Sequence, residues 1–473
     1  MRRLLGGYLC AITHVLASAV LLTSLAGQAF SQNTQFHGFL PGTLVVSRIH
    51  YDGNAFGSTE TFPTIFNDPN ISGITASVHI DEYLPIPFFP RLGTLPLTGI
   101  VTSFSSKSEG ALTLSTSGKY LTYMGYDAGV GLNGVSNSYT TAANLAGNTN
   151  PLYDREVALI AADGTVTLTP EANAYSGDNP RAAITVDGTQ FYMVGNSDST
   201  IAKDGTGPGT TIGARYGTPG SNVSYQLGVY AALDRPDESA KQHVKDNNFR
   251  GVAIFNGNLF TSKGSGGNGD DGIFQVHDGS GNGLPTGTTN TITKLLGDPA
   301  TDPNTGAASP LTPFGFWFAN ATTLYVADEG YSNLDANGNL IPDPMAGLQK
   351  WSLIGGTWKL DYVIQAGLDL DKPKNIPGYP VPTFTTGIRN ITGTKNLDGT
   401  VAVFAITGQY STISGGEPDP TRLVVATDEL SAMSLPTGLR ALFYDNFITL
   451  QQAPSGDVFR GVAFAPCSFC GHF

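Results

Sequence analysis

The sequence predicts an all-β protein folded as a six-bladed β-propeller, and three observations support that fold class. Residues 312–365 contain four short apolar runs separated by turn-forming residues, which is typical of one four-stranded antiparallel sheet. Glycine (59) and proline (29) are abundant and only 13% of the residues are charged, as expected where the chain turns often. A first strand of this kind also recurs along the chain, and sheets that stack radially form a propeller.

The recurrence defines six repeat stations, the residues at which the aligned first strands begin. They are spaced 64 to 75 residues apart, at Glu109, Arg181, Arg250, Phe314, Arg389 and Arg460. A second strand follows each of the first five stations, in the segments GKYLTYMGYD, GTQFYMVGN, GNLFTSKG, TTLYVADEG and GTVAVFAITG. Five units therefore share one internal layout.

The sixth unit is incomplete, because only 13 residues follow Arg460. Residues 42–53 and 76–84 resemble a second and a third strand, and the chain up to about residue 102 supplies a fourth. The ring is therefore predicted to close with a blade shared between the N- and C-termini. This leaves no long free sheet edge, and we expect a monomer. Seven blades are the alternative, if residues 127–153 contain another sheet.

The first 31 residues have the pattern of a secretory signal peptide. Arg2 and Arg3 precede an almost uncharged run, which ends in small residues before residue 32. We therefore expect a single propeller domain at 32–473, with a tail at 467–473, in a secreted, extracellular or periplasmic protein. A retained membrane anchor is the alternative reading of the apolar run, and no later segment is long enough to span a bilayer.

The net charge and the cysteine content indicate which partners and which cross-links to expect. The formal net charge of −13 argues against nucleic acid, because phosphate binding relies on clustered Lys and Arg. Cys10 would leave with the signal peptide, so Cys467 and Cys470 are predicted to form a local disulfide in an oxidising compartment. A metal site that adds His472 is the alternative, but it lacks a fourth ligand.

Several strings in this sequence resemble a family of secreted, mostly bacterial β-propeller proteins of unassigned activity. They are SEGALTLSTSGKYLTYMGYDAG, NPRAAI, TLYVADEG, GLQKWSLIGGTWKLDY and FRGVAFAP. The resemblance covers most of the mature chain and implies its fold and its export. More distantly, the chain looks like the broad class of six-bladed propellers, which includes sugar-ester and lactone hydrolases as well as binding modules. No catalytic motif of those enzymes is recognisable here.

Charged residues at the repeat stations form the candidate site. Arg181, Arg250, Arg389 and Arg460, with Glu109, are predicted to converge near one mouth of the central channel. Converging guanidinium groups favour a planar anion such as a carboxylate. The alternative is structural, because carboxylates in the loops after the second strands would pair with these arginines and clamp neighbouring blades. These carboxylates are Asp127, Asp198, Asp270, Asp271, Asp328 and Glu329.

Calcium is the candidate cofactor. Asp335, Asn337, Asn339 and Asp343 place oxygen-bearing side chains close together in one loop, although the spacing differs from an EF-hand. Plain turn formation explains the same residues.

The sequence leaves the activity open. The leading hypothesis is a module that binds an anionic carbohydrate or a cell-surface partner at the loop-rich channel face. The alternative is an extracellular hydrolase or lyase that acts on an anionic carbohydrate or lactone at the channel mouth. The sequence contains no Gly-x-Ser-x-Gly motif, and its mature cysteines lie in the tail.

Overall fold

The structure is a computed structural model, and most of the chain after residue 35 is described in it. The described residues are 36–51, 74–103, 108–144, 147–198, 211–230, 247–264, 270–279, 283–288, 290–297, 311–331, 335, 340–370, 372–413, 418–442 and 444–468. The predicted signal peptide, residues 1–31, lies outside them. Within these ranges the fold is all-β apart from short 3-10 turns such as η4 (Gly438–Leu442), and no helix is long and apolar enough to cross a bilayer.

Four separate antiparallel sheets have four strands each. The first pairs in the order β11-β10-β9-β8, and the others pair in chain order from β12 to β15, β16 to β19 and β20 to β23. Their bounds are β8 (Pro180–Ile184), β9 (Phe191–Gly195), β10 (Ala214–Gly217), β11 (Tyr225–Gly228), β12 (Phe249–Phe255), β13 (Asn258–Lys263), β14 (Gly272–His277), β15 (Thr291–Gly297), β16 (Pro313–Asn320), β17 (Thr323–Asp328), β18 (Gly347–Ile354), β19 (Thr357–Ile364), β20 (Phe384–Lys395), β21 (Thr400–Tyr410), β22 (Arg422–Glu429) and β23 (Ile448–Gln452).

The remaining strands form a sheet of eight, with both ends of the chain in it. Its order is β24-β1-β2-β3-β5-β6-β7, and β4 also pairs with β5. The C-terminal strand β24 lies directly beside the N-terminal strand β1. A single residue pair, Val101 with Tyr126, connects β3 to β5. The bounds are β1 (Leu44–His50), β2 (Ala76–Tyr83), β3 (Gly93–Thr102), β4 (Leu112–Leu114), β5 (Tyr120–Tyr126), β6 (Arg155–Ala161), β7 (Val166–Glu171) and β24 (Asp457–Phe464).

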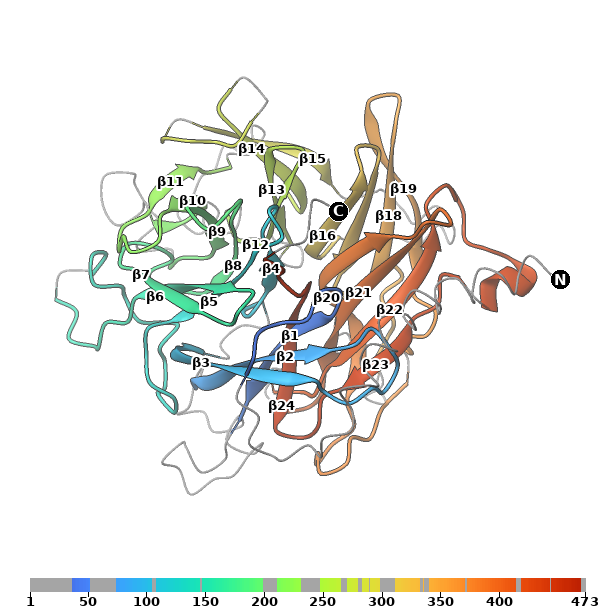
Figure 1. Ribbon diagram of the computed structural model, residues 1–473, viewed down its shortest axis with the longest axis horizontal. Coiled ribbons are helices and arrows are strands. Elements are labelled where there is room, and N and C mark those ends of the chain that lie inside the picture. Colours follow the sequence, from blue (N-terminus) through green and yellow to red (C-terminus); the bar gives the residue numbers. More distant parts are fainter. Residues whose placement is uncertain are drawn as a thin grey trace.

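The sheets follow one another around a centre in a propeller arrangement (Figure 1). Strands β4, β8, β12, β16, β20 and β24 lie nearest that centre, and residues of all six line one cavity. The aligned segments of the sequence repeat form these six strands or lead directly into them. The first strand of each predicted unit is thus the strand that lies nearest the centre.

Each sheet buries both faces against neighbouring sheets, which explains the apolar character of its strands. In β17, Tyr325 and Ala327 pack in a cluster with residues of β21 and β22, whereas Leu324 and Val326 pack in a cluster with residues of β13 and β14. Successive side chains of a strand point to opposite faces, so one strand contributes to two interfaces. The core is thus divided among the interfaces between sheets, and the innermost strands are left to line the centre.

Candidate functional site

The central cavity collects residues from six distant parts of the sequence. Its volume is about 280 Å³, and its lining includes Glu109, Arg250, Phe314, Arg389 and Arg460. Arg181 does not line it, although the following residue, Ala182, does. The structure therefore brings five of the six repeat stations to one cavity and places the sixth beside it.

Glu329, which follows β17, forms ion pairs with two arginines that belong to the sheets on either side of its own. The Oε1 atom of Glu329 lies 2.6 Å from Nη1 of Arg250, and its Oε2 atom lies 3.2 Å from Nε of Arg389. Phe314 lies between them, with its ring centroid 4.4 Å from Cζ of Arg250 and 5.7 Å from Cζ of Arg389. An aromatic face attracts a cation at such distances. Three neighbouring sheets are thus joined at the cavity by one carboxylate and one ring.

Glu109 occupies a different, fully hydrogen-bonded environment. It is only 3% exposed. Its carboxylate accepts hydrogen bonds from Oγ1 of Thr102 (2.7 Å), the backbone N and Oγ of Ser103 (2.9 Å each), the hydroxyl of Tyr126 (2.9 Å) and Nδ2 of Asn179. Thr102 and Tyr126 belong to the eight-stranded sheet, whereas Asn179 directly precedes β8 of the next sheet, so Glu109 also joins adjacent sheets.

Arg181 is buried, with 4% of its surface exposed, and forms no ion pair among the described residues. Its Nη1 atom donates to Oδ1 of Asn248 and to the carbonyl oxygen of Phe249, at 3.4 Å. Its Nε atom has no hydrogen-bond partner in the described part of the chain. Burial, and then the like charge of Arg250, lowers the pKa of Arg181 to about 10. The charges of Asp178, Glu109 and Glu329 offset this lowering of the Arg181 pKa only in part.

Arg460 packs closely against the backbone of the next station. Gly110 has a φ of +85°, and a Cβ atom placed on it would lie 2.8 Å from Cβ of Arg460. Glycine adopts this backbone conformation readily, while other residues are strained by it. The glycine that follows Glu109 therefore allows the two stations to approach.

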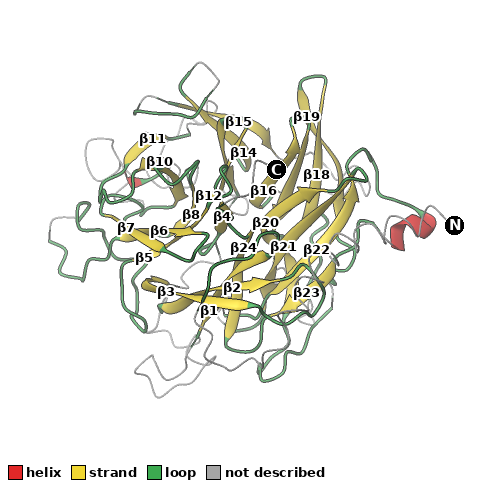
Figure 2. Cartoon of the chain, in the orientation of Figure 1, coloured by secondary structure: helices red, strands yellow, loops and turns green. Residues whose placement is uncertain are grey.

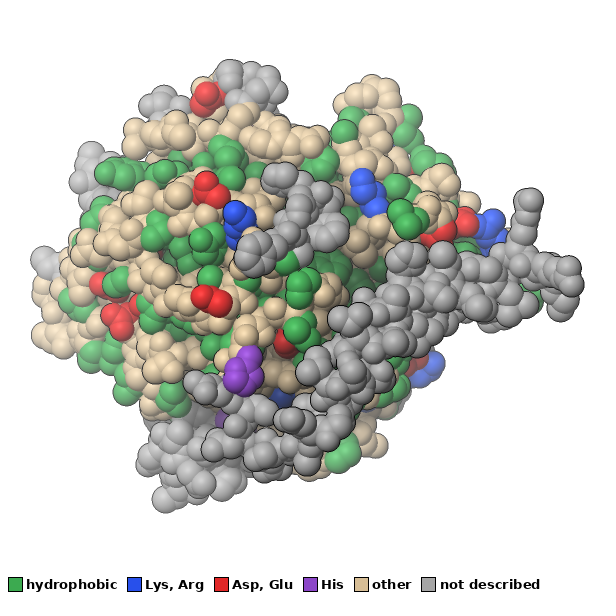
Figure 3. Space-filling view, viewed as in Figure 1, with side chains coloured by type: hydrophobic (Ala, Val, Ile, Leu, Met, Phe, Trp, Pro, Cys, Tyr) green, Lys and Arg blue, Asp and Glu red, His purple; other side chains and the backbone are tan. Residues whose placement is uncertain are grey.

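The cavity combines charged and apolar side chains. Its lining includes the guanidinium groups of Arg250, Arg389 and Arg460 and the carboxylate of Glu109, and Glu329 pairs with two of these arginines. The rest of the lining includes many apolar side chains, among them Leu112, Ile184, Val252, Ile254, Phe316 and Ile391. On the face drawn in Figure 3 the Lys and Arg side chains that are visible lie singly.

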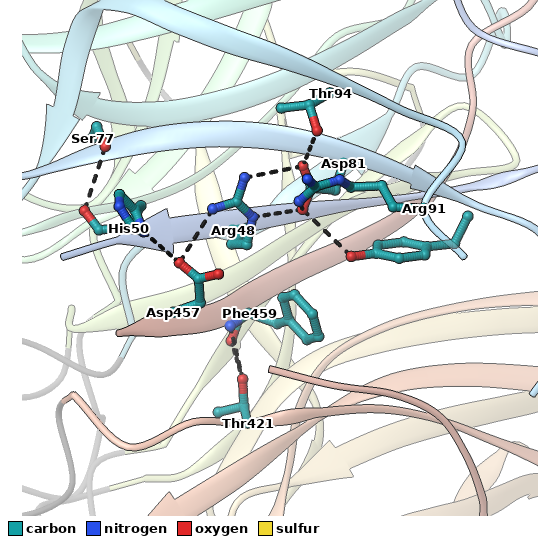
Figure 4. A network of polar contacts seen from close by, with 10 residues as sticks. Arg48, His50, Ser77, Asp81, Arg91, Thr94, Thr421, Asp457 and Phe459 are labelled. Carbon is teal, nitrogen blue, oxygen red and sulfur yellow. Dashed lines mark hydrogen bonds and ion pairs between the residues drawn. The ribbon is translucent and has the colours of Figure 1, made fainter. Parts of the chain in front are cut away.

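A second polar network links the two ends of the chain (Figure 4). The Nε atom of Arg48 lies 2.6 Å from Oδ2 of Asp81, and its Nη1 atom lies 3.2 Å from Oδ1 of Asp457. The same Oδ1 atom lies 2.7 Å from Nδ1 of His50. Asp81 also accepts hydrogen bonds from Arg91 and Thr94. Arg48 and His50 of β1 thus contact Asp81 of β2 and Asp457 of β24, and these contacts stabilise the pairing of the three strands.

His79 lies beside this network on β2. It is the cross-strand partner of Arg48, and the two-residue period of the strand puts it on the same face as Asp81. Burial, and then the charge of Arg48, lowers the pKa of His79 to about 4. The imidazole is therefore neutral at physiological pH. The two-residue alternation of His79 and Asp81 is visible in the sequence, whereas the contacts of Asp81 with Arg48, Arg91 and Thr94 are seen only in the structure.

The other sequence-predicted residues are only partly described. Asp335 is exposed and Asp343 is 6% exposed, while Asn337 and Asn339 lie outside the described residues. No group of three or more metal-ligating His, Cys, Asp or Glu side chains occurs in the described part of the chain. Cys467 is disulfide-bonded, and Cys470 lies outside the described residues. The calcium site and the pairing of Cys467 with Cys470 stay predictions.

Comparison with known proteins returns only distant structural similarities. No protein-family model and no curated protein matches this sequence. A Bacteroides uniformis protein determined as a candidate 6-phosphogluconolactonase is 10% identical with a TM-score of 0.34, over 88% of this chain and 99% of that one. An ulvan lyase of a new polysaccharide lyase family, bound to a GlcA(1-4)Rha3S unit, is 13% identical with a TM-score of 0.33, over 90% and 97%.

The hemagglutinin-neuraminidase ectodomain of parainfluenza virus 5 is 8% identical with a TM-score of 0.37, over 74% of this chain and 75% of that one. None of these similarities identifies a ligand or a reaction for this chain.

Proposed function

We propose that this chain is an exported six-bladed propeller that binds an anionic ligand at the mouth of its central channel. The blade count rests on the eight-stranded sheet, whose halves β24-β1-β2-β3 and β4-β5-β6-β7 are connected by a single residue pair. Counting each half as a blade adds two to the four separate sheets. The alternative of seven blades has less support, because residues 127–153 contain no strand in their described part.

The arginines of the lining carry the binding proposal. Arg250, Arg389 and Arg460 line the cavity, and a buried guanidinium whose charge is incompletely balanced is costly, a cost that falls when an anion approaches. The clamp formed by Glu329 neutralises part of the charge on Arg250 and Arg389, but one carboxylate cannot balance two guanidinium groups. A bound anion would supply the missing negative charge at the mouth.

We propose a carboxylate as the anionic group, carried by a carbohydrate or by a surface partner. Guanidinium groups recognise carboxylates through paired hydrogen bonds. The apolar side chains deeper in the channel would contact the less polar faces of the same ligand. The volume of about 280 Å³ limits the bound part to roughly one or two sugar rings.

A hydrolase or lyase at this mouth has less support than a binding module. An acid-base mechanism needs a carboxylate that is available to exchange a proton with substrate. Glu109 accepts five hydrogen bonds from the protein, and Glu329 pairs with two arginines. Both carboxylates are therefore committed to neighbouring side chains.

Calorimetric titration with glucuronate, using glucose as the neutral match, tests the proposal. Arg250→Gln, at a residue that lines the cavity, is expected to weaken glucuronate binding at least tenfold, because a charge-assisted hydrogen bond contributes on the order of 1.5–3 kcal/mol. Glu329→Gln removes a competing negative charge and is expected to strengthen binding. Arg91→Gln, in the network of Figure 4, is the control and should have no effect. Equal affinity of wild type and a folded Arg250→Gln variant would refute the proposed site.

Export is a separate part of the proposal and rests on residues 1–31. N-terminal sequencing of protein recovered outside the cytoplasm is expected to begin at residue 32. Recovery of the intact chain in a membrane fraction would support the anchor instead.

A further inference from the structure

A buried polar row crosses the sheet β16–β19 on the side that faces β20–β23. The strand register places Lys350 of β18 directly between Tyr325 of β17 and Tyr362 of β19. The three side chains therefore point to the same face, and each of them is fully buried. All three meet one carboxylate of the neighbouring sheet, that of Asp428 on β22.

Asp428 contacts all three side chains of this row and also shares a hydrogen bond with Asp445. Its Oδ2 atom lies 2.9 Å from Nζ of Lys350 and accepts a hydrogen bond from the hydroxyl of Tyr325, and its Oδ1 atom accepts one from the hydroxyl of Tyr362 at 2.7 Å. The Nζ atom of Lys350 donates further to the hydroxyl of Tyr362 and to the carbonyl oxygen of Glu429. Asp428 and Lys350 thus balance each other as a buried ion pair.

A cavity of about 270 Å³ lies on the outer side of Asp428, under the segment that contains η4. Figure 2 shows η4 at the periphery of the molecule, away from the central channel. The lining includes Asp428, Glu429, Met433, Arg440, Tyr444 and Asp445. Three of these six residues are carboxylates and only one, Arg440, carries positive charge.

Asp445 is the unusual member of this lining. It is 5% exposed, and its Oδ1 atom has no hydrogen-bond partner among the described residues. Its backbone has a φ of +55°, which non-glycine residues rarely adopt, and its amide donates to the carbonyl oxygen of Thr427. The charged and titratable groups around it are Asp428, Glu429, Lys350, Tyr325, Tyr362, Asp361, Arg440 and Tyr444. Burial, and then the charge of Asp428, raises the pKa of Asp445 to about 8.

Arg440 already shows how a cation is held at the edge of this cavity. Its guanidinium pairs with Glu429 and lies 5.7 Å from the ring centroid of Tyr444. More than half of the Arg440 side chain is exposed, so it leaves the interior of the cavity open to a second cation. A carboxylate and an aromatic ring together favour an organic cation.

We propose that this cavity, between the end of β22 and the η4 segment, is a second ligand site and that it binds a small molecule carrying a protonated amine. The amine would donate hydrogen bonds to Asp445, whose Oδ1 atom has no donor within the described ranges, while Met433 and Tyr444 contact the rest of the ligand. Binding would release the proton of Asp445 to solvent. This site takes a charge opposite to that of the channel ligand, so either proposal can fail without the other.

Calorimetric titration with glucosamine and with glucose tests this site, because the two probes differ in one amine. At pH 7 we expect glucosamine to bind at least tenfold more tightly than glucose. Repeating the titration in buffers of different ionisation enthalpy should show proton release on glucosamine binding. Arg440→Ala removes the competing cation and is expected to strengthen glucosamine binding.

Asp445→Asn is the decisive variant. It should weaken glucosamine binding at least tenfold and abolish the proton release, while Asp369→Asn, an acidic residue outside the cavity, should do neither. If Asp445→Asn does not fold, the two probes and Arg440→Ala still decide the question. Equal binding of the two probes, binding of neither, or unchanged affinity in a folded Asp445→Asn protein would overturn the proposal.

Discussion

Replacing Glu171 with glutamine is expected to change how the stability of the protein depends on pH. Glu171 ends β7 and is fully buried, and neither of its carboxylate oxygens has a hydrogen-bond partner among the described residues. Burial raises the pKa of Glu171 to about 7, an effect that Ser224 and Arg215 offset only in part. Ionising Glu171 in the folded protein therefore costs free energy, and this cost lowers the stability of the wild type.

The sign and the size of the effect follow from the two pKa values. Between the unfolded value of about 4.5 and the folded value of about 7, the unfolded chain releases this proton while the folded chain keeps it. Stability therefore falls as the pH rises through this window and levels off above it. A difference of about 2.5 pKa units corresponds to at most about 3 kcal/mol.

The assay is thermal unfolding of wild type and Glu171→Gln from pH 4 to 8. With an unfolding entropy of roughly 2.1 cal/mol/K per residue, about 3 kcal/mol corresponds to a shift in Tm of about 3 °C in a chain of this length. The variant should match wild type near pH 4.5 and melt about 3 °C higher above pH 7. Other titrating groups occur in both proteins and cancel in the difference.

Glu156→Gln provides the matched comparison, because burial raises the pKa of Glu156 to about 8. The Tm of Glu156→Gln should keep rising relative to wild type up to about pH 8, whereas the Tm difference of Glu171→Gln levels off near pH 7. A Tm difference for Glu171→Gln that is the same at pH 4.5 and pH 7.5 would refute the reasoning, because it would mean that the folded protein ionises Glu171 normally.

Two further substitutions test the packing of the ring. Asp457→Ala removes the acceptor shared by Arg48 and His50 and is expected to cost about 1–2 kcal/mol, seen as a Tm lower by roughly 1–2 °C. An unchanged Tm would mean that the network contributes nothing to closure. Gly110→Ala places a methyl group 2.8 Å from Cβ of Arg460 at a positive φ, so it should cost about 1–3 kcal/mol and weaken anion binding at the channel; a wild-type Tm and affinity would contradict the close approach of the two stations.

The sequence was most informative about strands and their order around the centre. The recurrence of similar first strands identified β8, β12, β16, β20 and β24, because each repeats one local pattern of β-forming and turn residues. It also anticipated that the strand after Arg460 pairs with the N-terminal segment, as β24 does with β1. Local patterns of this kind are visible without coordinates.

Side-chain contacts between sheets were less accessible to sequence analysis. Glu329 was recognised as a carboxylate that would face the arginines, but its bridging of Arg250 and Arg389 depends on positions 60 and 79 residues away. The row of Tyr325, Lys350 and Tyr362 depends on the register between three strands, which loop lengths alone do not determine. Asp445 gave no sequence signal, because an isolated aspartate after a turn is ordinary turn chemistry.

The pairing of β1 with β24 has a consequence for the order of events during biosynthesis. Arg48 and Asp457 are separated by 409 residues in the chain, and closing a loop of that length costs on the order of 5 kcal/mol in chain entropy. The ribosome makes β24 long after β1, so β1 stays without this neighbour until residues 457–464 have been synthesised. Sheets made only from contiguous strands have no such delay. We therefore expect the nascent protein to keep an open ring until β24 emerges.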